Sequence, residues 1–85
     1  MTPPGRRAGG YSQAARVLVL LELLRTHRHG LTMAVLSERL EVTPRQVRRD
    51  LGALEEAGYG VEAQADGEGR RRFRLARTPE GTVEP

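Results

Sequence analysis

The stretch from Val42 to Leu51 constrains the fold more than any other part of the chain, because it carries several signals of a helix start at once. Thr43 suits the N-cap position, Pro44 suits the first helical position, and Gln46 completes a T-x-x-Q capping box. The apolar residues that follow recur at the spacing of one buried helix face, and they are Val47, Leu51 and Leu54. The sequence therefore predicts a helix over about residues 44–57 that buries this stripe.

The charged residues of this predicted helix divide between its outer and inner sides. At about 100° per residue, Arg45 and Arg49 point away from the apolar stripe, and Arg48 lies on the flank. Cations near a helix N-terminus gain nothing from the helix dipole, so these arginines indicate a partner outside the protein. Asp50 faces inward beside the stripe, and we interpret it as a structural ion-pair or capping group. The exposed Gly52 costs roughly 1 kcal/mol relative to alanine; it either permits close approach of the partner or is a tolerated surface glycine.

A first helix is predicted from about Gln13 to Thr26, with Ser12 as its N-cap. Its core stripe consists of Val17, Leu20, Leu21 and Leu24. Val19 and Leu23 fall on a second apolar strip, where a surface helix should be polar. Either the tails or a later hairpin cover these two residues, or they form a dimer contact.

A short second helix is predicted over Met33–Leu40, with Thr32 as its N-cap after a brief extended link. Leu36 and Leu40 supply its buried pair. A turn of three residues, 41–43, then leads into the helix described above. A short helix, a three-residue turn and a second helix with outward arginines match a helix-turn-helix.

The last third of the folded part reads as a β-hairpin. The long helix ends near residue 57, and Gly58 is placed to be the left-handed residue after it. Small or apolar and polar residues alternate over 61–65, and residues 66–69 form a turn signal. In the return strand one face carries Arg71, Phe73 and Leu75, and the other carries Arg70, Arg72 and Arg74. The predicted fold is mainly α with a small β-hairpin, a winged helix-turn-helix of three helices plus a wing.

Length and composition exclude several classes of protein. Eighty-five residues make one domain, expected over residues 12–75, between turn-rich segments 1–11 and 76–85 that we interpret as flexible tails. There is no cysteine, and the His27-x-His29 pair has no third ligand nearby, so no metal or cofactor is expected. No nucleophile–base–acid set is visible, so we expect no enzymatic activity. No apolar run approaches the roughly 18 residues of a membrane helix, and a cytoplasmic protein is the simplest interpretation.

The basic residues indicate both the kind of genome that encodes the chain and the kind of partner that it binds. All fourteen residues of the lysine and arginine classes are arginine, and asparagine and isoleucine are also absent. These missing residues use AT-rich codons, which indicates a GC-rich bacterial genome. The net charge is only +3, but residues 43–50 carry three arginines against one aspartate, and residues 70–74 carry four arginines with no acid. Two basic patches on a small domain favour a polyanionic partner.

Three segments carry a family resemblance, and they are Leu36-Ser37-Glu38-Arg39-Leu40-Glu41-Val42-Thr43, Arg45-Gln46-Val47-Arg48-Arg49-Asp50-Leu51 and Leu54-Glu55-Glu56-Ala57-Gly58. With them, residues 12–75 resemble the winged helix-turn-helix heads of bacterial DeoR-type and WYL-domain transcription regulators. The resemblance implies sequence-specific binding of duplex DNA, with the helix from Pro44 in the major groove. Glu41 stands where such families usually carry glycine, so we expect a positive φ there. Gln46 replaces the usual threonine, which changes the expected base preference. The family's C-terminal effector domain has no counterpart, so no small-molecule ligand is predicted.

On this interpretation Arg45, Gln46 and Arg49 read bases, because arginine can donate two hydrogen bonds to guanine and glutamine can pair with adenine. Phosphate contacts are expected from Thr43, Arg48, Arg70, Arg72 and Arg74. Asp66 and Glu68 at the hairpin tip would be repelled in a minor groove, so we expect no deep insertion.

Two further hypotheses concern partners other than DNA. A domain of this size reads few base pairs, so a homodimer on half-sites about 10–10.5 base pairs apart would raise specificity, with Val19 and Leu23 as the candidate contact. The competing function is a winged-helix adaptor that binds another protein through the same apolar strip. RNA binding is a weaker option, because only three aromatic residues are present for stacking. Salt-dependent binding to random duplex DNA would separate a DNA reader from an adaptor.

Overall fold

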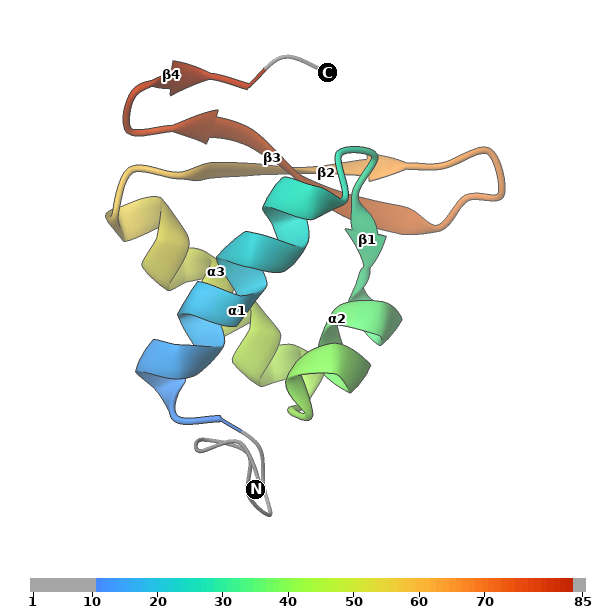
Figure 1. Cartoon of the computed structure of the whole chain (residues 1–85). Coiled ribbons are helices and arrows are strands. Elements are labelled where there is room, and N and C mark those ends of the chain that lie inside the picture. Colours follow the sequence, from blue (N-terminus) through green and yellow to red (C-terminus); the bar gives the residue numbers. More distant parts are fainter. Residues whose placement is uncertain (1–10, 84–85) are drawn as a thin grey trace.

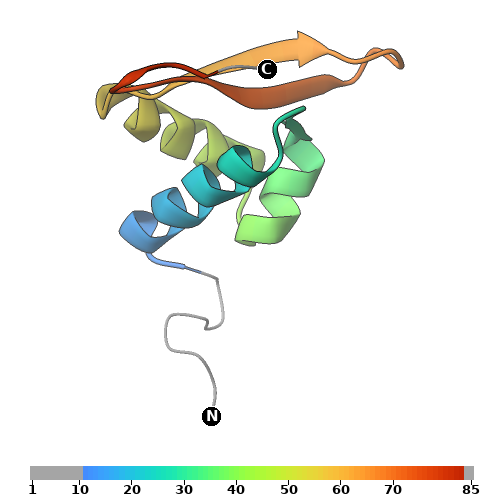
Figure 2. The same ribbon diagram turned by 45° about the horizontal axis from the view of Figure 1, so that its top comes forward.

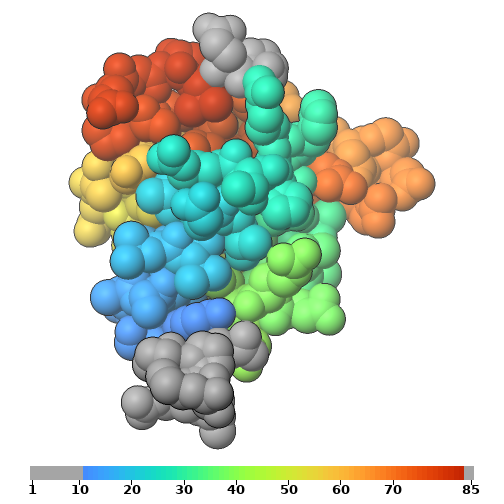
Figure 3. Space-filling model, viewed as in Figure 1, coloured from blue at the N-terminus to red at the C-terminus, as the bar shows by residue number. Residues whose placement is uncertain are grey.

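The computed structural model describes residues 11–83, in which three helices lie against one face of a small antiparallel sheet (Figures 1 and 2). The elements are α1 (Gln13–Thr26), β1 (Leu31–Thr32), α2 (Met33–Leu40), α3 (Pro44–Glu56), β2 (Gly60–Ala65), β3 (Arg71–Thr78) and β4 (Gly81–Thr82). The hairpin of β2 and β3 projects from the helical body as a wing (Figure 3). The winged helix-turn-helix fold is therefore confirmed. The N-terminal tail predicted over 1–11 lies, except for Tyr11, outside the described residues.

Each helix begins with the cap that the sequence predicts. The Ser12 hydroxyl accepts from the Ala15 N–H at 3.3 Å, and the Thr32 hydroxyl accepts from the Val35 N–H at 3.3 Å. At α3 both halves of the capping box are present. Each cap satisfies an amide that has no partner inside the helix, so these three residues fix where the helices begin.

The core is one cluster to which all three helices and the sheet contribute. Its buried apolar residues are Leu20, Leu24, Leu31, Leu36, Leu40, Val47, Leu51, Leu54, Phe73 and Leu75. The stripes predicted for α2 and α3 are confirmed. The stripe predicted for α1 is only partly right, because Val17 and Leu21 are half-buried and Arg16 takes the third buried position. Arg16 lies four residues before Leu20, which lies four before Leu24, so the buried face follows this spacing.

The second apolar strip of α1 is not fully open to solvent. Val19 and Leu23 are half-buried and pack against the core cluster. Among the large apolar side chains of residues 11–83, Leu18 is the exposed one, at 68 % of its surface. α1 is therefore apolar on most of its circumference, and Leu18 is the residue of this helix that protrudes.

The turn between α2 and α3 contains the positive φ that the sequence predicts. Glu41 has φ 59° and ψ 43°, which places it in the left-handed helical region. Its N–H donates to the Glu38 carbonyl at 3.2 Å, and the Val42 N–H donates to the Ser37 carbonyl at 3.1 Å. These bonds close the end of α2 and set the start of α3. Gly58, after α3, is left-handed as predicted, with φ 101°.

The sheet extends further toward the C-terminus than predicted. β3 is central: β2 pairs along one edge, while β1 and then β4 pair along the other. The prediction that 76–85 is a flexible tail is wrong for residues 76–83, because β3 continues to Thr78 and β4 returns along it. The Val83 N–H donates to the Ala76 carbonyl at 3.0 Å, and Val83 packs against the core. Backbone hydrogen bonds to β3 order this segment. A strand of two residues is too short to show a periodic pattern in the sequence. Residues 84–85 lie outside the described part.

Candidate nucleic-acid interface

The outward face of α3 presents three arginines. Arg45, Arg48 and Arg49 are exposed, while the opposite face of the helix is buried in the core. Within residues 11–83 none of the three has a hydrogen bond or an ion pair. Guanidinium groups that are exposed, charged and unpaired are available to phosphates and to guanine edges. The structure therefore places these predicted site residues together at the start of one helix.

Thr43 and Gln46 are exposed as predicted, but both are engaged in the cap of α3. The Gln46 N–H donates to the Thr43 hydroxyl at 3.2 Å, and the Thr43 N–H donates to the Gln46 side-chain oxygen at 3.4 Å. The Thr43 hydroxyl keeps its own proton for donation to a phosphate. Gln46 would have to release its oxygen from the cap before it could pair with both polar groups of an adenine edge.

Gly52 lies inside α3 without a packing reason. A β-carbon built at this position meets no atom within 4 Å beyond the helix's own neighbouring backbone. Its backbone is helical, and its φ does not lie in the positive range. Alanine would therefore fit in the free protein. The glycine either serves the contact with a partner or is a tolerated surface residue.

The wing arginines lie together as predicted, but acids of the same hairpin pair with each of them. Arg70 lies 2.6 Å from the Glu68 carboxylate and 3.3 Å from that of Asp66. Arg72 donates to Asp66 at 3.2 Å and to the Gly30 carbonyl at 3.1 Å. Arg74 donates to the Glu62 carboxylate at 3.1 Å. These pairs offset much of the positive charge that the sequence suggested for the wing.

Asp66 organises the hairpin turn. Its carboxylate accepts from the Glu68 N–H at 2.8 Å and from the Arg70 N–H at 2.9 Å. Hydrogen bonding by the Glu68 amide, then by the Arg70 amide and the Arg72 side chain, lowers the pKa of Asp66 below its ordinary value. Asp66 therefore fixes the shape of the tip, which the sequence showed only as a cluster of turn residues.

Arg71 is a basic residue of the wing that the sequence analysis did not select. It is exposed, and no partner for it occurs in the described part of the chain. It begins β3 on the face that carries Phe73, at the projecting end of the hairpin. The alternation of the strand, which places Arg71 on the face opposite Arg70, Arg72 and Arg74, is the signal that identifies it.

Asp50 is the structural ion-pair residue that the sequence predicts, and its partner is Arg16 of α1. Both side chains are buried, and the Arg16 guanidinium donates to both carboxylate oxygens. The α3 surface that is open to a partner therefore contains no acid among residues 44–54. This surface is basic partly because Asp50 is buried in the core instead of lying beside the arginines.

Two other classes of site receive no support in residues 11–83. No group of three or more histidine, cysteine, aspartate or glutamate residues in this part could hold a metal ion. None of its helices combines the length and the apolar character that crossing a lipid bilayer requires.

A sequence model of a family described as an HTH domain matches residues 16–68, which run from the first turn of α1 to the hairpin turn. This range contains α2, the turn and α3, together with the buried Arg16–Asp50 pair. No curated protein and no solved structure matches the chain.

Proposed function

The chain belongs to the HTH-domain family, and on this premise we propose that it reads double-stranded DNA sequence-specifically as a bacterial transcription regulator. The observation that carries the proposal is the trio Arg45, Arg48 and Arg49, which are exposed and, within residues 11–83, unpaired at the start of α3. An α-helix fits the major groove, and the N-terminal residues of a recognition helix meet the base edges. The resemblance to DeoR-type and WYL-domain heads supports the same orientation of α3.

The residues of α3 take different roles in this proposal. Arg45 and Arg49 lie opposite the buried stripe and read bases, while Arg48 on the flank binds a phosphate. Thr43 donates to a second phosphate. Gln46 reads a base only at the cost of its capping bond, so it ranks below the two arginines.

The wing has a smaller role than α3. Arg70, Arg72 and Arg74 reach phosphates only by exchanging their bonds to the wing acids for bonds to DNA. Arg71 has no such bond within the described residues and is added to the candidate phosphate contacts. The wing therefore adds sequence-independent affinity rather than specificity.

The test is selection of bound sequences from a randomised duplex pool, followed by titration of the selected site by fluorescence anisotropy. Arg45→Ala and Arg49→Ala should each cost about 1–3 kcal/mol and relax the preference at one base position. Arg48→Ala should weaken selected and random duplexes alike, and should lower the salt dependence by about one unit. Arg25→Ala on α1 is the matched control and should leave affinity unchanged. If Arg49→Ala selected the same motif with the same affinity, the assignment of α3 to the groove would be wrong.

We further propose that two copies bind together on half-sites about 10–10.5 base pairs apart. The support is α1, on which Leu18 is exposed next to the half-buried Val19, with Leu23 further along the helix. A symmetric selected motif would agree with this arrangement. Sedimentation that shows a monomer at high concentration, without DNA, would remove α1 as the contact.

The alternative function is a protein-binding adaptor, and the exposed Leu18 is the observation that favours it. On that view the arginines maintain solubility, and α1 docks a partner protein. An adaptor should bind random duplex DNA weakly and with little salt dependence. A DNA reader should bind it at about micromolar concentration and lose affinity steeply as salt rises.

A further inference from the structure

The outer edge of β2 is open in the part of the chain that the structure describes. β2 stands last in the strand order β1-β3-β2, so it pairs with β3 along one edge only. Residues 62–65 are exposed, and the hairpin that carries them projects from the helical body (Figure 3). The backbone groups on such an edge can pair with another strand.

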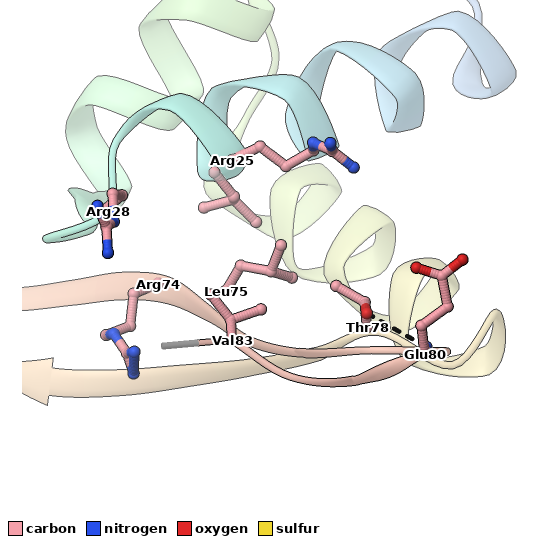
Figure 4. Close-up of a pocket in the computed structure, with 8 residues that line it drawn as sticks. Arg25, Arg28, Arg74, Leu75, Thr78, Glu80 and Val83 are labelled. Atoms are coloured by element: carbon pink, nitrogen blue, oxygen red, sulfur yellow. Dashed lines mark hydrogen bonds between the residues drawn. The ribbon is translucent and has the colours of Figure 1, made fainter. Parts of the chain in front are cut away.

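The opposite edge of the sheet differs, because the chain itself covers both of its ends. β1 pairs with the beginning of β3 and β4 pairs with its end. Figure 4 shows the turn into β4, where the Glu80 N–H donates to the Thr78 hydroxyl at 3.2 Å. Val83 is the last described residue, and β3 separates it from β2. The strand that returns after β3 therefore leaves the edge of β2 uncovered.

The hydrogen bonds of the hairpin show which peptide groups of β2 face β3. Just beyond the end of β2, the Asp66 N–H donates to the Arg70 carbonyl at 2.7 Å. Hydrogen-bonded pairs recur at every second residue of an antiparallel ladder. Because the register is regular over residues 61–65, the peptide groups of Gln64 and Glu62 also face β3.

The peptide groups of Val61, Ala63 and Ala65 are therefore the ones that face the open edge. A second observation agrees with this assignment. Ala63 lies opposite Phe73, and the Phe73 carbonyl points to the far edge of β3, where a β-carbon on Gly30 would lie 2.8 Å from its oxygen. The two residues thus form a non-hydrogen-bonded pair, so the N–H and carbonyl of Ala63 point outward.

We propose that this edge pairs with β2 of a second copy of the chain, antiparallel and about a two-fold axis at Ala63. The outward-facing residues then meet one another, with Ala63 opposite Ala63 and Val61 opposite Ala65. Each of these pairs exchanges two backbone hydrogen bonds. The contact uses no residue of α1 or α3, so the proposal does not rest on the binding of DNA or on a dimer through α1.

The side chains between these pairs select both the partner and the register. Glu62 comes opposite Gln64 of the second copy, so no like charges meet. An axis at Glu62 would place two Glu62 carboxylates opposite each other, and an axis at Gln64 would place Glu62 opposite Asp66. Like charges directly opposite destabilise a sheet. Glu62 also accepts from Arg74 at 3.1 Å, and residues 61–65 contain no proline, so the usual obstacles to edge pairing are absent from this strand.

The two-fold axis also determines where the helices lie. The helices of one copy cover one face of its sheet (Figure 2), and an axis perpendicular to the sheet keeps the helices of both copies on the same face. Because the paired strands run in opposite directions, the projecting end of one hairpin lies beside the beginning of the other copy's β2. The two helical bodies are therefore directed toward opposite ends of the joined sheet.

The test is amide hydrogen exchange, measured by NMR on the full chain without DNA. Samples at about 0.02 mM and about 2 mM bracket the Kd of about 0.1–1 mM that we expect from a few backbone hydrogen bonds set against the cost of association. The amides of Val61, Ala63 and Ala65 should exchange about two- to fivefold more slowly in the concentrated sample. The amides of Glu62 and Gln64, which face β3, should change little and are the internal control.

Substitutions at Gln64 test the register. Gln64→Glu places a carboxylate opposite Glu62 in both halves of the dimer and should weaken association about fivefold, whereas Gln64→Arg should strengthen it about fivefold. Within one hairpin residue 64 lies opposite Arg72, so the effects of the two substitutions on hairpin stability have the opposite sign. Association that follows hairpin stability instead of this order would overturn the proposed register.

Ala63→Pro removes an N–H that points to the open edge, a position where a strand tolerates proline, and it should abolish the concentration dependence. Leu18→Glu, at the exposed leucine of α1, is the control and should leave the exchange of the β2 amides unchanged. Exchange that is independent of concentration would overturn the proposal, whether the outward amides are open throughout or covered by another part of the chain. Association that persists in folded Ala63→Pro, or that is lost in Leu18→Glu, would overturn it too.

Discussion

Arg16 and Asp50 join the first turn of α1 to the middle of α3 through a buried ion pair with two points of contact. The Nε of Arg16 donates to one carboxylate oxygen, and a terminal nitrogen donates to the other at 3.2 Å. Asp50 is completely buried, and Arg16 is 7 % exposed. The hydrogen bond to Asp50 raises the pKa of Arg16 above its ordinary value. Arg49 immediately precedes Asp50, so the same pair fixes the rotation that turns Arg49 outward.

Removal of one partner of this pair should destabilise the fold strongly. In Asp50→Asn the guanidinium stays buried without its counter-ion, and we expect the free energy of unfolding to fall by about 3–5 kcal/mol. This is a large part of the roughly 5–15 kcal/mol that holds a domain together. Urea denaturation followed by circular dichroism measures the loss.

The double variant Arg16→Met/Asp50→Leu separates the pair's net contribution from the cost of an orphaned charge. It should recover most of the lost stability, since an apolar pair of similar volume often replaces a buried ion pair without loss. Arg25→Met, at an exposed arginine of the same helix, should change stability by less than about 0.5 kcal/mol. A cost in Asp50→Asn no larger than that control would contradict the structural role of the pair.

Glu41 holds a left-handed backbone without being a glycine. With φ 59°, its β-carbon is strained, at a cost of about 1–2 kcal/mol for a non-glycine residue. We expect Glu41→Gly to raise the free energy of unfolding by about 0.5–1 kcal/mol, after the extra flexibility of glycine in the unfolded chain is subtracted. Glu41→Ala keeps the β-carbon and is the matched control; it should give no gain. Equal effects of the two substitutions in urea denaturation would show that strain is not the cause.

Features that depend on near neighbours could be predicted from the sequence. The caps at Ser12, Thr32 and Thr43 involve residues within three positions of each other, so the sequence carries the whole signal. The left-handed Glu41 was expected from the family resemblance, because such families usually carry glycine at this position. The outward direction of the α3 arginines follows from helix geometry alone. The fold and the outward face of α3 in the candidate site could therefore be predicted from the sequence.

Features that join distant residues could not be predicted in the same way. Asp50 was identified as an ion-pair residue, but its partner lies 34 positions away and only tertiary packing selects it. Arg72 donates to a backbone carbonyl 42 positions away. Its place in the alternating pattern of the strand did not reveal this hydrogen bond. β4 has only two residues, and it forms by pairing with the edge of β3. For the candidate site, the consequence is that the sequence did not show the pairing of Arg70, Arg72 and Arg74 with acids of the hairpin.

The hairpin tip should lose its order in acid because of Asp66. Its folded pKa lies below the ordinary value, chiefly because the Glu68 amide donates to the carboxylate, and the Arg70 amide and Arg72 side chain add to this. Its stabilising effect is therefore complete above the ordinary pKa of about 4 and is lost as the pH falls through the lower, folded value. The amide resonances of Glu68 and Arg70 should report this titration.

Asp66→Asn isolates the charge, since its amide oxygen can accept the same backbone bonds but does not titrate. The acid-dependent change at the two amides should vanish in this variant and persist in Glu68→Gln. A midpoint at or above the ordinary aspartate value would show that the turn does not favour the charged carboxylate.

The acids of the wing should limit its contribution to DNA affinity. Glu62→Gln frees Arg74, and Glu68→Gln removes one of the two partners of Arg70. Each substitution should strengthen binding to random duplex DNA and make the logarithmic salt dependence steeper by about one unit for each phosphate that a freed arginine binds. Glu22→Gln on α1 changes the net charge equally and is the control. Fluorescence anisotropy over a range of salt concentrations measures both quantities, and slopes equal to that of the control would show that the wing does not reach the backbone of DNA.

Gly52 offers a case in which stability and binding should move in opposite directions. A methyl group at this position meets no neighbouring atom within 4 Å beyond the local helix backbone, so Gly52→Ala should raise the free energy of unfolding by roughly 1 kcal/mol through helix propensity. If the backbone of α3 approaches the groove at Gly52, the same methyl should weaken binding of the selected duplex about tenfold, or about 1.4 kcal/mol. Glu41→Gly is the matched control, because it also stabilises the fold but leaves the outward face of α3 unchanged, so its affinity should not differ from the parent. A Gly52→Ala variant that is more stable and binds the selected duplex as tightly as the parent would identify Gly52 as a tolerated surface residue.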